Sequence, residues 1–153
     1  MNPMMPIDEF NARVGALMGR RLFSGKYLDL TFPPGWLGLI ERTVIDLEAL
    51  PGGTDLRCHQ IKEKWGSLRL HLYLESGSIP EDQTYPVDGP LEFLRPDGEL
   101  GQRAETITLQ AEDESAALCY LCGEPARMRQ HGWVLPLCDD HERDDFRDLL
   151  EGY

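Results

Sequence analysis

The sequence predicts an α+β fold in which a small antiparallel sheet, built on one hairpin, is flanked by helices and followed by a compact C-terminal module. Three patterns support this prediction. Apolar residues recur at helical spacing in three segments, residues 7–22, 36–50 and 100–118. They alternate with polar residues from Leu68 to Leu74, as in a strand with one buried face. Two close pairs of Cys and His lie between residues 119 and 141.

The first two helical segments carry recognisable start and stop signals. The first has Asp8 near its start and Arg20-Arg21 at its end, where these charges complement the helix dipole. The second follows Pro33-Pro34-Gly35 and is ended by Pro51-Gly52-Gly53. Residues 24–35 between the two segments are rich in turn-forming residues, so a connector is predicted there.

The predicted hairpin pairs residues 56–64 with the strand that begins at Leu68, through a turn at Trp65-Gly66-Ser67. The following stretch, residues 76–98, is rich in Pro, Gly and acidic residues and has no clear period. We expect a long surface loop there, with a short strand near residues 91–94. The chain is accordingly divided into an α+β domain, residues 1–118, and a module, residues 119–153, packed on it as one unit.

The strongest chemical signal is the pattern C-x2-C-G and C-x2-H, with fifteen residues between the two pairs. The four potential ligands are Cys119, Cys122, Cys138 and His141. Thiolate sulfur and imidazole nitrogen suit zinc, which binds four such ligands in a closed tetrahedral shell at about 2.0–2.3 Å. One structural Zn²⁺ is therefore predicted, the alternative being a disulfide or unrelated thiols. The remaining cysteine, Cys58, is expected to be a small buried residue.

The second ligand pair lies at the start of a predicted helix, residues 139–150. A knuckle, a short hairpin and such a helix would form a treble-clef arrangement. The helix would be strongly acidic, and only the carboxylates of its first turn have a structural reason to be there, the helix dipole. The others leave an anionic face larger than capping requires.

The net charge of −12 is concentrated in one half of the chain. Residues 1–75 contain nine Lys/Arg and nine Asp/Glu, whereas residues 76–153 contain six and eighteen. An acidic half repels phosphate backbones and anionic membranes and steers a basic partner inward, although solubility alone would also explain it. We see neither a secretory signal nor an apolar run long enough to span a bilayer, and the cysteine usage predicts a reducing cytoplasm.

Two stretches together resemble a group of small, mostly uncharacterised bacterial proteins. Residues 60–69, QIKEKWGSLR, are similar to the "QIKEKFGxLRFY" hairpin of that group. Its C-terminal "C-x2-C-G-x-P…GW…LC-x2-H" module resembles the stretch from Cys119 to His141, which includes Pro125 and Gly132-Trp133. The likeness covers most of residues 34–142 and departs at the acidic stretch 76–98. It implies the zinc site but no activity. Members recur beside phage-like and toxin-bearing loci, which implies an immunity role.

Catalysis is not expected from these residues. Four protein ligands would close the zinc shell, so the metal would have no open position for hydrolysis. HNH-type nucleases share the treble clef, but they need an Asn downstream of the His, and the chain has only Asn2 and Asn11. His59 and His71 lie on predicted strands without a nucleophile pattern.

The sequence therefore predicts a non-enzymatic protein-binding module, an immunity protein that occludes a basic bacterial toxin domain through acidic surfaces. The expected partner-binding residues are Glu81, Asp82, Asp88, Asp144, Asp145 and Asp148. The alternative is a small zinc-dependent nucleic-acid-binding regulator. Its expected contact residues are Lys62, Lys64, Arg127 and Arg129.

Overall fold

A computed structural model describes residues 2–26, 28–76, 95–130, 133–143 and 145–153, and it has the predicted α+β architecture. Within these residues the elements are α1 (Ile7–Met18), η1 (Arg21–Phe23), β1 (Asp29–Leu30), η2 (Pro34–Trp36), α2 (Leu37–Glu48), β2 (Leu56–Lys64), β3 (Ser67–Leu74), α3 (Gly98–Ser115), β4 (Arg127–Gln130), β5 (Val134–Leu137) and η4 (Phe146–Leu150). None of the described helices combines the length and apolar character that a bilayer span requires.

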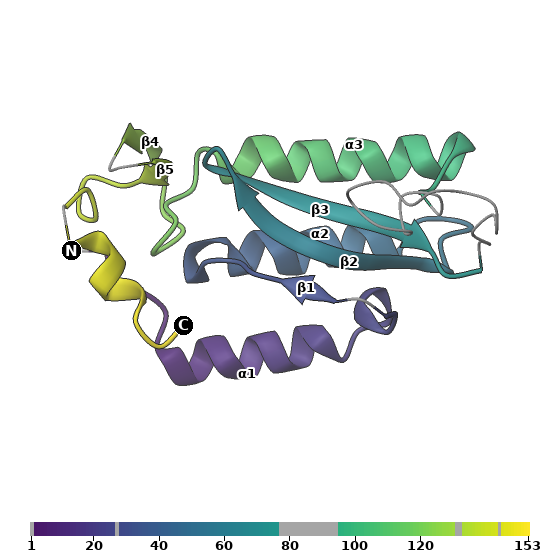
Figure 1. The fold of residues 1–153 in the computed structure, drawn as a ribbon, viewed down its shortest axis with the longest axis horizontal. Helices are drawn as coiled ribbons and strands as arrows, with labels where there is room; N and C mark the ends of the chain where they lie inside the picture. The colour runs from purple at the N-terminus through teal and green to yellow at the C-terminus, as the bar shows by residue number, and fades with distance from the viewer. Residues whose placement is uncertain (1, 27, 77–94, 131–132, 144) are drawn as a thin grey trace, which may run out of the picture.

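The main sheet has the strand order β1-β2-β3. β1 runs parallel to β2, whereas β2 and β3 form the predicted antiparallel hairpin, which closes at Lys64 and Ser67. α2 passes behind this sheet, α3 runs along its β3 side and α1 lies on its β1 side (Figure 1). Their apolar faces enclose one core, whose fully buried members include Leu22, Trp36, Leu37, Ile40, Val44, Leu47, Leu56, Ile61 and Leu68.

A bulge in β2 keeps its apolar side chains on the core face. Cys58 pairs with Leu72 and Gln60 pairs with His71, so His59 is the extra residue of the strand. The insertion shifts the alternation by one residue. Cys58 and Ile61 therefore both face the core, where each is at most 1% exposed. The expectation that Cys58 is a small buried residue is confirmed.

Helix ends differ from the predicted ones by a few residues. The first helix ends at Met18 instead of residue 22, and the chain then forms η1, whose Leu22 and Phe23 still bury their side chains. The third helix covers Gly98–Ser115 instead of 100–118. Beyond Ser115 the chain turns toward the C-terminal module, because Ala117 and Leu118 donate to the carbonyls of Glu114 and Ser115 in short turns.

Two predictions about regular structure are wrong. The connector 24–35 contains β1 and η2, since Leu30 lies opposite Ile61 and Thr31 N–H donates to the carbonyl of Ile61. The predicted helix 139–150 is a single turn followed by the 3-10 helix η4. The module thus has the knuckle and the hairpin of a treble clef but not its regular helix. The predicted strand near 91–94 lies outside the described residues.

The C-terminal module is joined to the main core at Gly35 and Trp36. Gly35 N–H donates to the carbonyl of Tyr120 at 3.1 Å, and the indole N–H of Trp36 donates to the carbonyl of Leu118 at 3.1 Å. The Trp36 ring is fully buried and meets Tyr120 edge-on at 5.2 Å between centroids. A Cβ on Gly35 would lie 2.0 Å from the carbonyl oxygen of Cys119, so only glycine permits this approach.

We expect Gly35→Ala to destabilise the protein by about 1–3 kcal/mol, because the added methyl meets backbone atoms that cannot move aside without distorting the module. Gly15→Ala is the matched control. Gly15 lies in α1 with no atom within 4 Å of a built Cβ, so this substitution should stabilise by about 0.5–1 kcal/mol. Urea unfolding of both variants measures the difference, and equal midpoints would contradict the close packing at Gly35.

Candidate metal centre

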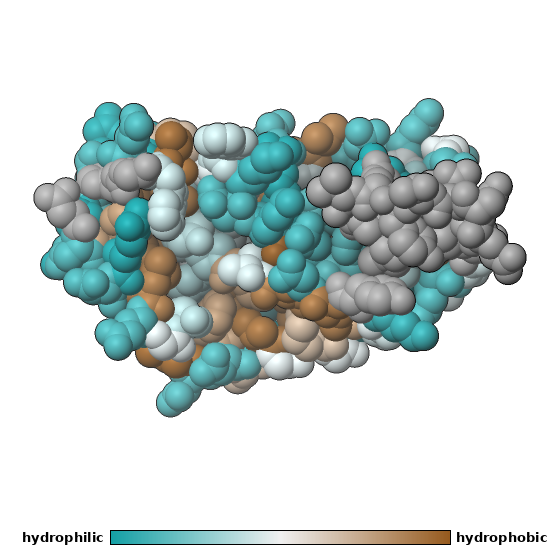
Figure 2. All heavy atoms as spheres, in the orientation of Figure 1, coloured by the Kyte–Doolittle hydropathy of each residue, from teal (hydrophilic) through white to brown (hydrophobic). Residues whose placement is uncertain are grey.

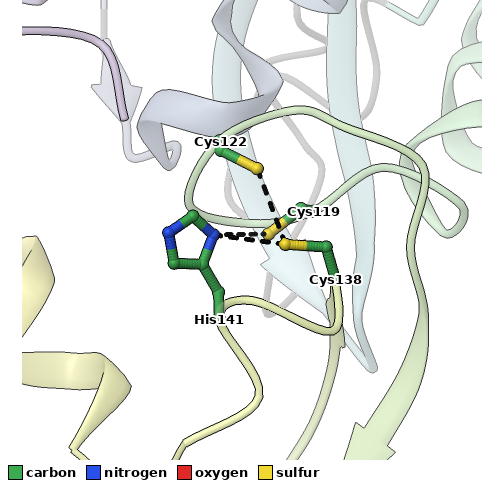
Figure 3. Close-up of side chains that lie close together, drawn as sticks. All are labelled: Cys119, Cys122, Cys138 and His141. Atoms are coloured by element: carbon green, nitrogen blue, oxygen red, sulfur yellow. Dashed lines mark hydrogen bonds between the residues drawn. The ribbon is translucent and has the colours of Figure 1, made fainter. Parts of the chain in front are cut away.

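The four predicted ligands come together in the structure. Cys119 and Cys122 lie in the loop after α3, Cys138 directly follows β5, and His141 lies in the turn after it. Their ligand atoms all lie within 4.8 Å of one another, and the side chains point toward a common centre (Figure 3). Cys119, Cys138 and His141 are buried and Cys122 is half-buried. The four residues can therefore hold one metal ion away from solvent.

Three of the distances between ligand atoms match the edges of a tetrahedron, and one of them excludes a disulfide between Cys122 and Cys138. Cys119 Sγ lies 3.7 Å from His141 Nδ1, Cys138 Sγ lies 3.3 Å from the same nitrogen, and Cys122 Sγ lies 3.8 Å from Cys138 Sγ. Metal–ligand bonds of about 2.0–2.3 Å give tetrahedral edges of about 3.3–3.8 Å. A disulfide would need two sulfurs about 2.05 Å apart. The alternative disulfide reading is therefore wrong, and all four cysteines are free thiols.

The first ligand pair is positioned by a tight backbone turn. Gly123 has φ of 80° and its N–H donates to the carbonyl of Cys119 at 2.9 Å. A Cβ on Gly123 would lie 2.7 Å from the carbonyl oxygen of Gly35. A glycine is needed here for both reasons, the left-handed backbone and the close approach of the main core. This turn holds Cys119 and Cys122 at the spacing that one ion requires.

The second pair is positioned by the carbonyl of Cys138, which accepts hydrogen bonds from the N–H groups of His141 and Glu142 at 3.1 and 3.0 Å. One turn is enough to bring His141 back over Cys138. No longer helix is needed to place these two ligands next to each other. The dense carboxylates after it favour helix weakly, because Asp is a poor helix former and like charges repel at adjacent turns.

Burial shifts the pKa values of two of the ligands, Cys122 and His141. It raises the pKa of the Cys122 thiol to about 12 and lowers the pKa of His141. The pKa of Cys138 is also lowered, because backbone and side-chain hydrogen bonds, including one from the amide of Asn2, outweigh the opposing effect of burial. His141 is thus neutral at pH 7, as a ligand must be, whereas Cys122 must release a proton when metal binds.

Arg129 braces the turn that carries Cys138 and His141. Its side chain is only 6% exposed and donates to the carbonyl of Leu137 at 3.2 Å. It also pairs with Asp139 at 2.6 Å and with Glu142. Arg129 lowers the pKa of the Asp139 carboxyl through this hydrogen bond. A buried arginine therefore fixes the residues on both sides of the second ligand pair.

Nothing matched this chain in comparisons with models of protein families, with curated proteins and with solved structures. The resemblance to the bacterial group with the QIKEKxGxLR hairpin therefore stays a prediction.

The four basic residues of the alternative interface are not all exposed to a ligand. Lys62 is half-buried on β2 and Lys64 is exposed at the hairpin tip. Arg127 is exposed on β4, with a guanidinium nitrogen 3.9 Å from Asp139. The buried Arg129 is used by the module itself. The sequence analysis did not predict that Arg129 braces the ligand turn. The alternation of β4 places Arg127 and Arg129 on the same face, and both pair with residues of β5, the strand that leads to Cys138.

The predicted acidic residues are only partly described. Asp145 makes two hydrogen bonds to the guanidinium of Arg143, at 2.5 and 2.7 Å, and Asp148 is exposed in η4. The other four predicted residues, Glu81, Asp82, Asp88 and Asp144, lie outside the described residues. The C-terminal carboxylates are therefore less available than their number suggests, because Asp139, Glu142 and Asp145 each pair with an arginine of the module.

We expect Cys138→Ser to lose the metal ion and to unfold at least residues 119–153, because the binding energy of such a site is folding energy. Cys58→Ala is the matched control, since Cys58 is equally buried but lies in the main core. Elemental analysis by mass spectrometry and circular dichroism measure the two effects. Full metal retention by Cys138→Ser would overturn the ligand assignment.

Arg129→Gln should weaken metal retention by about 10–100-fold in competition with a chelator, because residues that orient metal ligands have effects of this size. The expected ligand set stays intact, so the variant should still bind one ion. Arg127→Gln provides a comparison on the same strand, where the exposed side chain should contribute little. Equal metal affinity in the two variants would show that the brace has no role.

Proposed function

We propose that the chain is a non-enzymatic protein-binding module with one structural Zn²⁺, and that it acts as an immunity protein that neutralises a basic bacterial toxin domain. The observation that carries the proposal is the closed set of four ligands. A scaffold built around such a site has no open coordination position for a substrate. Binding, rather than metal-assisted hydrolysis, is then the function that the metal supports.

Zinc is the metal that fits this donor set best. Three sulfurs and one imidazole nitrogen are soft or borderline ligands, and hard cations such as Mg²⁺ and Ca²⁺ prefer oxygen. The tetrahedral edges derived above also fit zinc, which is four-coordinate in structural sites. When bound, zinc would supply cohesion between the loop after α3 and the chain after β5.

A cleft lies between the sheet and α3. It has a volume of about 950 Å³ and is lined by His59, His71, Arg69 and Glu112, among others. No serine or cysteine is among its described lining residues. Arg69 and Glu112 pair with each other at 2.9 Å, so both charges are already partnered. The described walls also contain Lys62, Thr108, Asp29 and Glu105, and the absence of serine and cysteine holds for the described lining alone.

A basic protein partner is favoured by the charge of α3. This helix contains five carboxylates, Glu99, Glu105, Glu112, Asp113 and Glu114, and one arginine, Arg103. All of them but Glu112 are exposed. Together with the acidic C-terminal segment, the helix would attract a basic domain and accelerate its association. A toxin that acts on nucleic acid is commonly basic, and the carboxylates would take the place of substrate phosphates.

The nucleic-acid-binding regulator remains the second candidate because of Lys64 and Arg127, which are exposed near the aromatic side chains of two hairpins. Two observations weigh against it. Arg129 is buried, and the carboxylates of α3 would repel a phosphate backbone at the same end of the molecule. We further propose a cytoplasmic location, where the ligand thiols stay reduced.

The test is capture from a native lysate of bacteria that carry this gene, with the zinc-loaded chain immobilised and washed at low and then moderate salt. We expect one basic protein domain to be retained. Charge reversal of five carboxylates, Glu81, Asp82, Asp144, Asp145 and Asp148, should reduce its retention at least tenfold, because steering and contact charges are both inverted.

The matched control reverses five exposed carboxylates of the charge-neutral half, Asp8, Glu9, Asp46, Asp55 and Glu75. This variant has the same net charge as the first one. If binding depends on the specific acidic surface, the control should still retain the basic protein. Unchanged binding of the first variant would refute the acidic interface. Nucleic acid that elutes with rising salt, without a basic protein, would favour the regulator instead.

A further inference from the structure

Trp65 is placed where folding gives no reason for a tryptophan. It forms, with Gly66, the two-residue turn between Lys64 and Ser67, and both turn residues have positive φ, 55° and 81°. Such turns favour Asn or Asp before Gly, and positive φ strains a bulky residue. The indole is 75% exposed, so its burial contributes little to the core. The strain and the exposed ring together indicate a role outside folding.

The tip of this hairpin lies against the hairpin of the metal module. A Cβ on Gly66 would be 2.7 Å from the Met128 sulfur and 3.0 Å from the Val134 carbonyl oxygen. Met128 is 39% exposed and Trp133, at the end of the β4–β5 turn, is 51% exposed. Hydrophobic atoms reach the surface over β4 and β5 in Figure 2. We call Trp65, Met128 and Trp133 the two-hairpin surface.

A guanidinium group lies over part of this surface. The Arg147 guanidinium carbon is 3.8 Å from the centroid of the Trp133 ring, which is within cation–π distance. Tryptophan, methionine and arginine are the residue types most enriched at the centres of protein interfaces. Tryptophan and arginine also dominate the energetically important positions of such interfaces. The composition of the two-hairpin surface is therefore typical of a protein-binding centre.

Carboxylates lie next to the hairpin tip at the C-terminal end of α3. Leu68 N–H donates to Ser115 Oγ at 2.8 Å, which ties the tip to the last turn of this helix. That turn ends with Glu112, Asp113 and Glu114 and has no basic residue. Negative charge is unfavourable at the negative end of the helix dipole. Glu112 and Glu114 also stabilise the fold, because they pair with Arg69 at 2.9 Å and with Arg42 at 3.6 Å, and Asp113 and Glu114 are exposed to a partner.

We propose that the two-hairpin surface is the apolar centre of the interface with the basic protein partner, and that Asp113 and Glu114 are part of its charged rim. This inference rests on the proposed function, which it deepens by locating the contact. The rim carboxylates would attract the basic side chains of such a protein. When the partner binds, the charged rim also helps to exclude water from the aromatic rings at the apolar centre.

The experiment uses Trp65→Asn in the full zinc-loaded chain. Asn-Gly is a preferred sequence for this turn, so the variant should unfold at the same or a higher denaturant concentration than the parent. The probe is the basic protein captured from the lysate, purified and titrated calorimetrically. We expect its affinity to fall at least about 30-fold, the loss typical of a central interface tryptophan.

Leu28→Gln is the matched control, because Leu28 is a 45% exposed apolar residue beside β1, outside the two-hairpin surface and its rim. It should bind the purified protein like the parent. Trp65→Phe, which keeps an aromatic ring, should recover most of the affinity if the ring makes the contact. Asp113→Asn with Glu114→Gln should mainly slow association and reduce its dependence on salt.

The outcomes separate this inference from the proposed function. Parent-like affinity of Trp65→Asn for the captured basic protein overturns the two-hairpin surface and leaves the proposed function intact. A chain that captures only nucleic acid, or no basic protein at all, overturns both. A large loss of stability in Trp65→Asn would reassign Trp65 to the fold and would also overturn the inference.

Discussion

The cluster of Cys119, Cys122, Cys138 and His141 is the constraint on which the C-terminal quarter of this protein depends. Outside it, the module has two four-residue strands and one short 3-10 helix, which bury few side chains. Its core contains six buried residues, and two of them are the ligands Cys119 and Cys138. So small a core offsets little of the entropy of ordering the segment, and a metal ion bound at the cluster would supply the missing free energy. Arg129 braces the single turn after Cys138 through Leu137, Asp139 and Glu142.

The metal module also matters for the larger core, because the two share a boundary of backbone atoms. Gly35 lies directly against the knuckle, and Trp36, fully buried, donates to the carbonyl of Leu118, the residue before the first ligand. Loss of the metal would therefore expose or displace the largest side chain of the main core. The same boundary sets the position of Gly66 against Met128 and with it the surface that two hairpins present together. In the binding role proposed above, the metal would therefore only hold the module in place and would not contact the partner.

Much of this arrangement could be predicted from local sequence patterns. The hairpin of β2 and β3 followed from strict alternation, and the ligands followed from spacing alone. The two-residue β1 could not be predicted, because it exists only through its pairing with Gln60 and Ile61, far along the chain. The predicted helix 139–150 is wrong because a closing turn and ion pairs with arginines determine that segment. The role of Arg129 was hidden for a related reason: its sequence neighbours suggest an exposed strand, and only the folded hairpin shows that it faces Asp139 and Glu142.

The central claim, a closed structural zinc site, can be tested without any partner. X-ray absorption at the zinc edge of the purified chain reports the number and type of ligand atoms directly. The geometry predicts three sulfur ligands at about 2.3 Å and one nitrogen at about 2.0 Å, with no light-atom ligand from solvent. A spectrum that requires a water oxygen in place of one protein ligand would contradict this account. It would mean an open coordination position and would bring metal-assisted chemistry back into consideration.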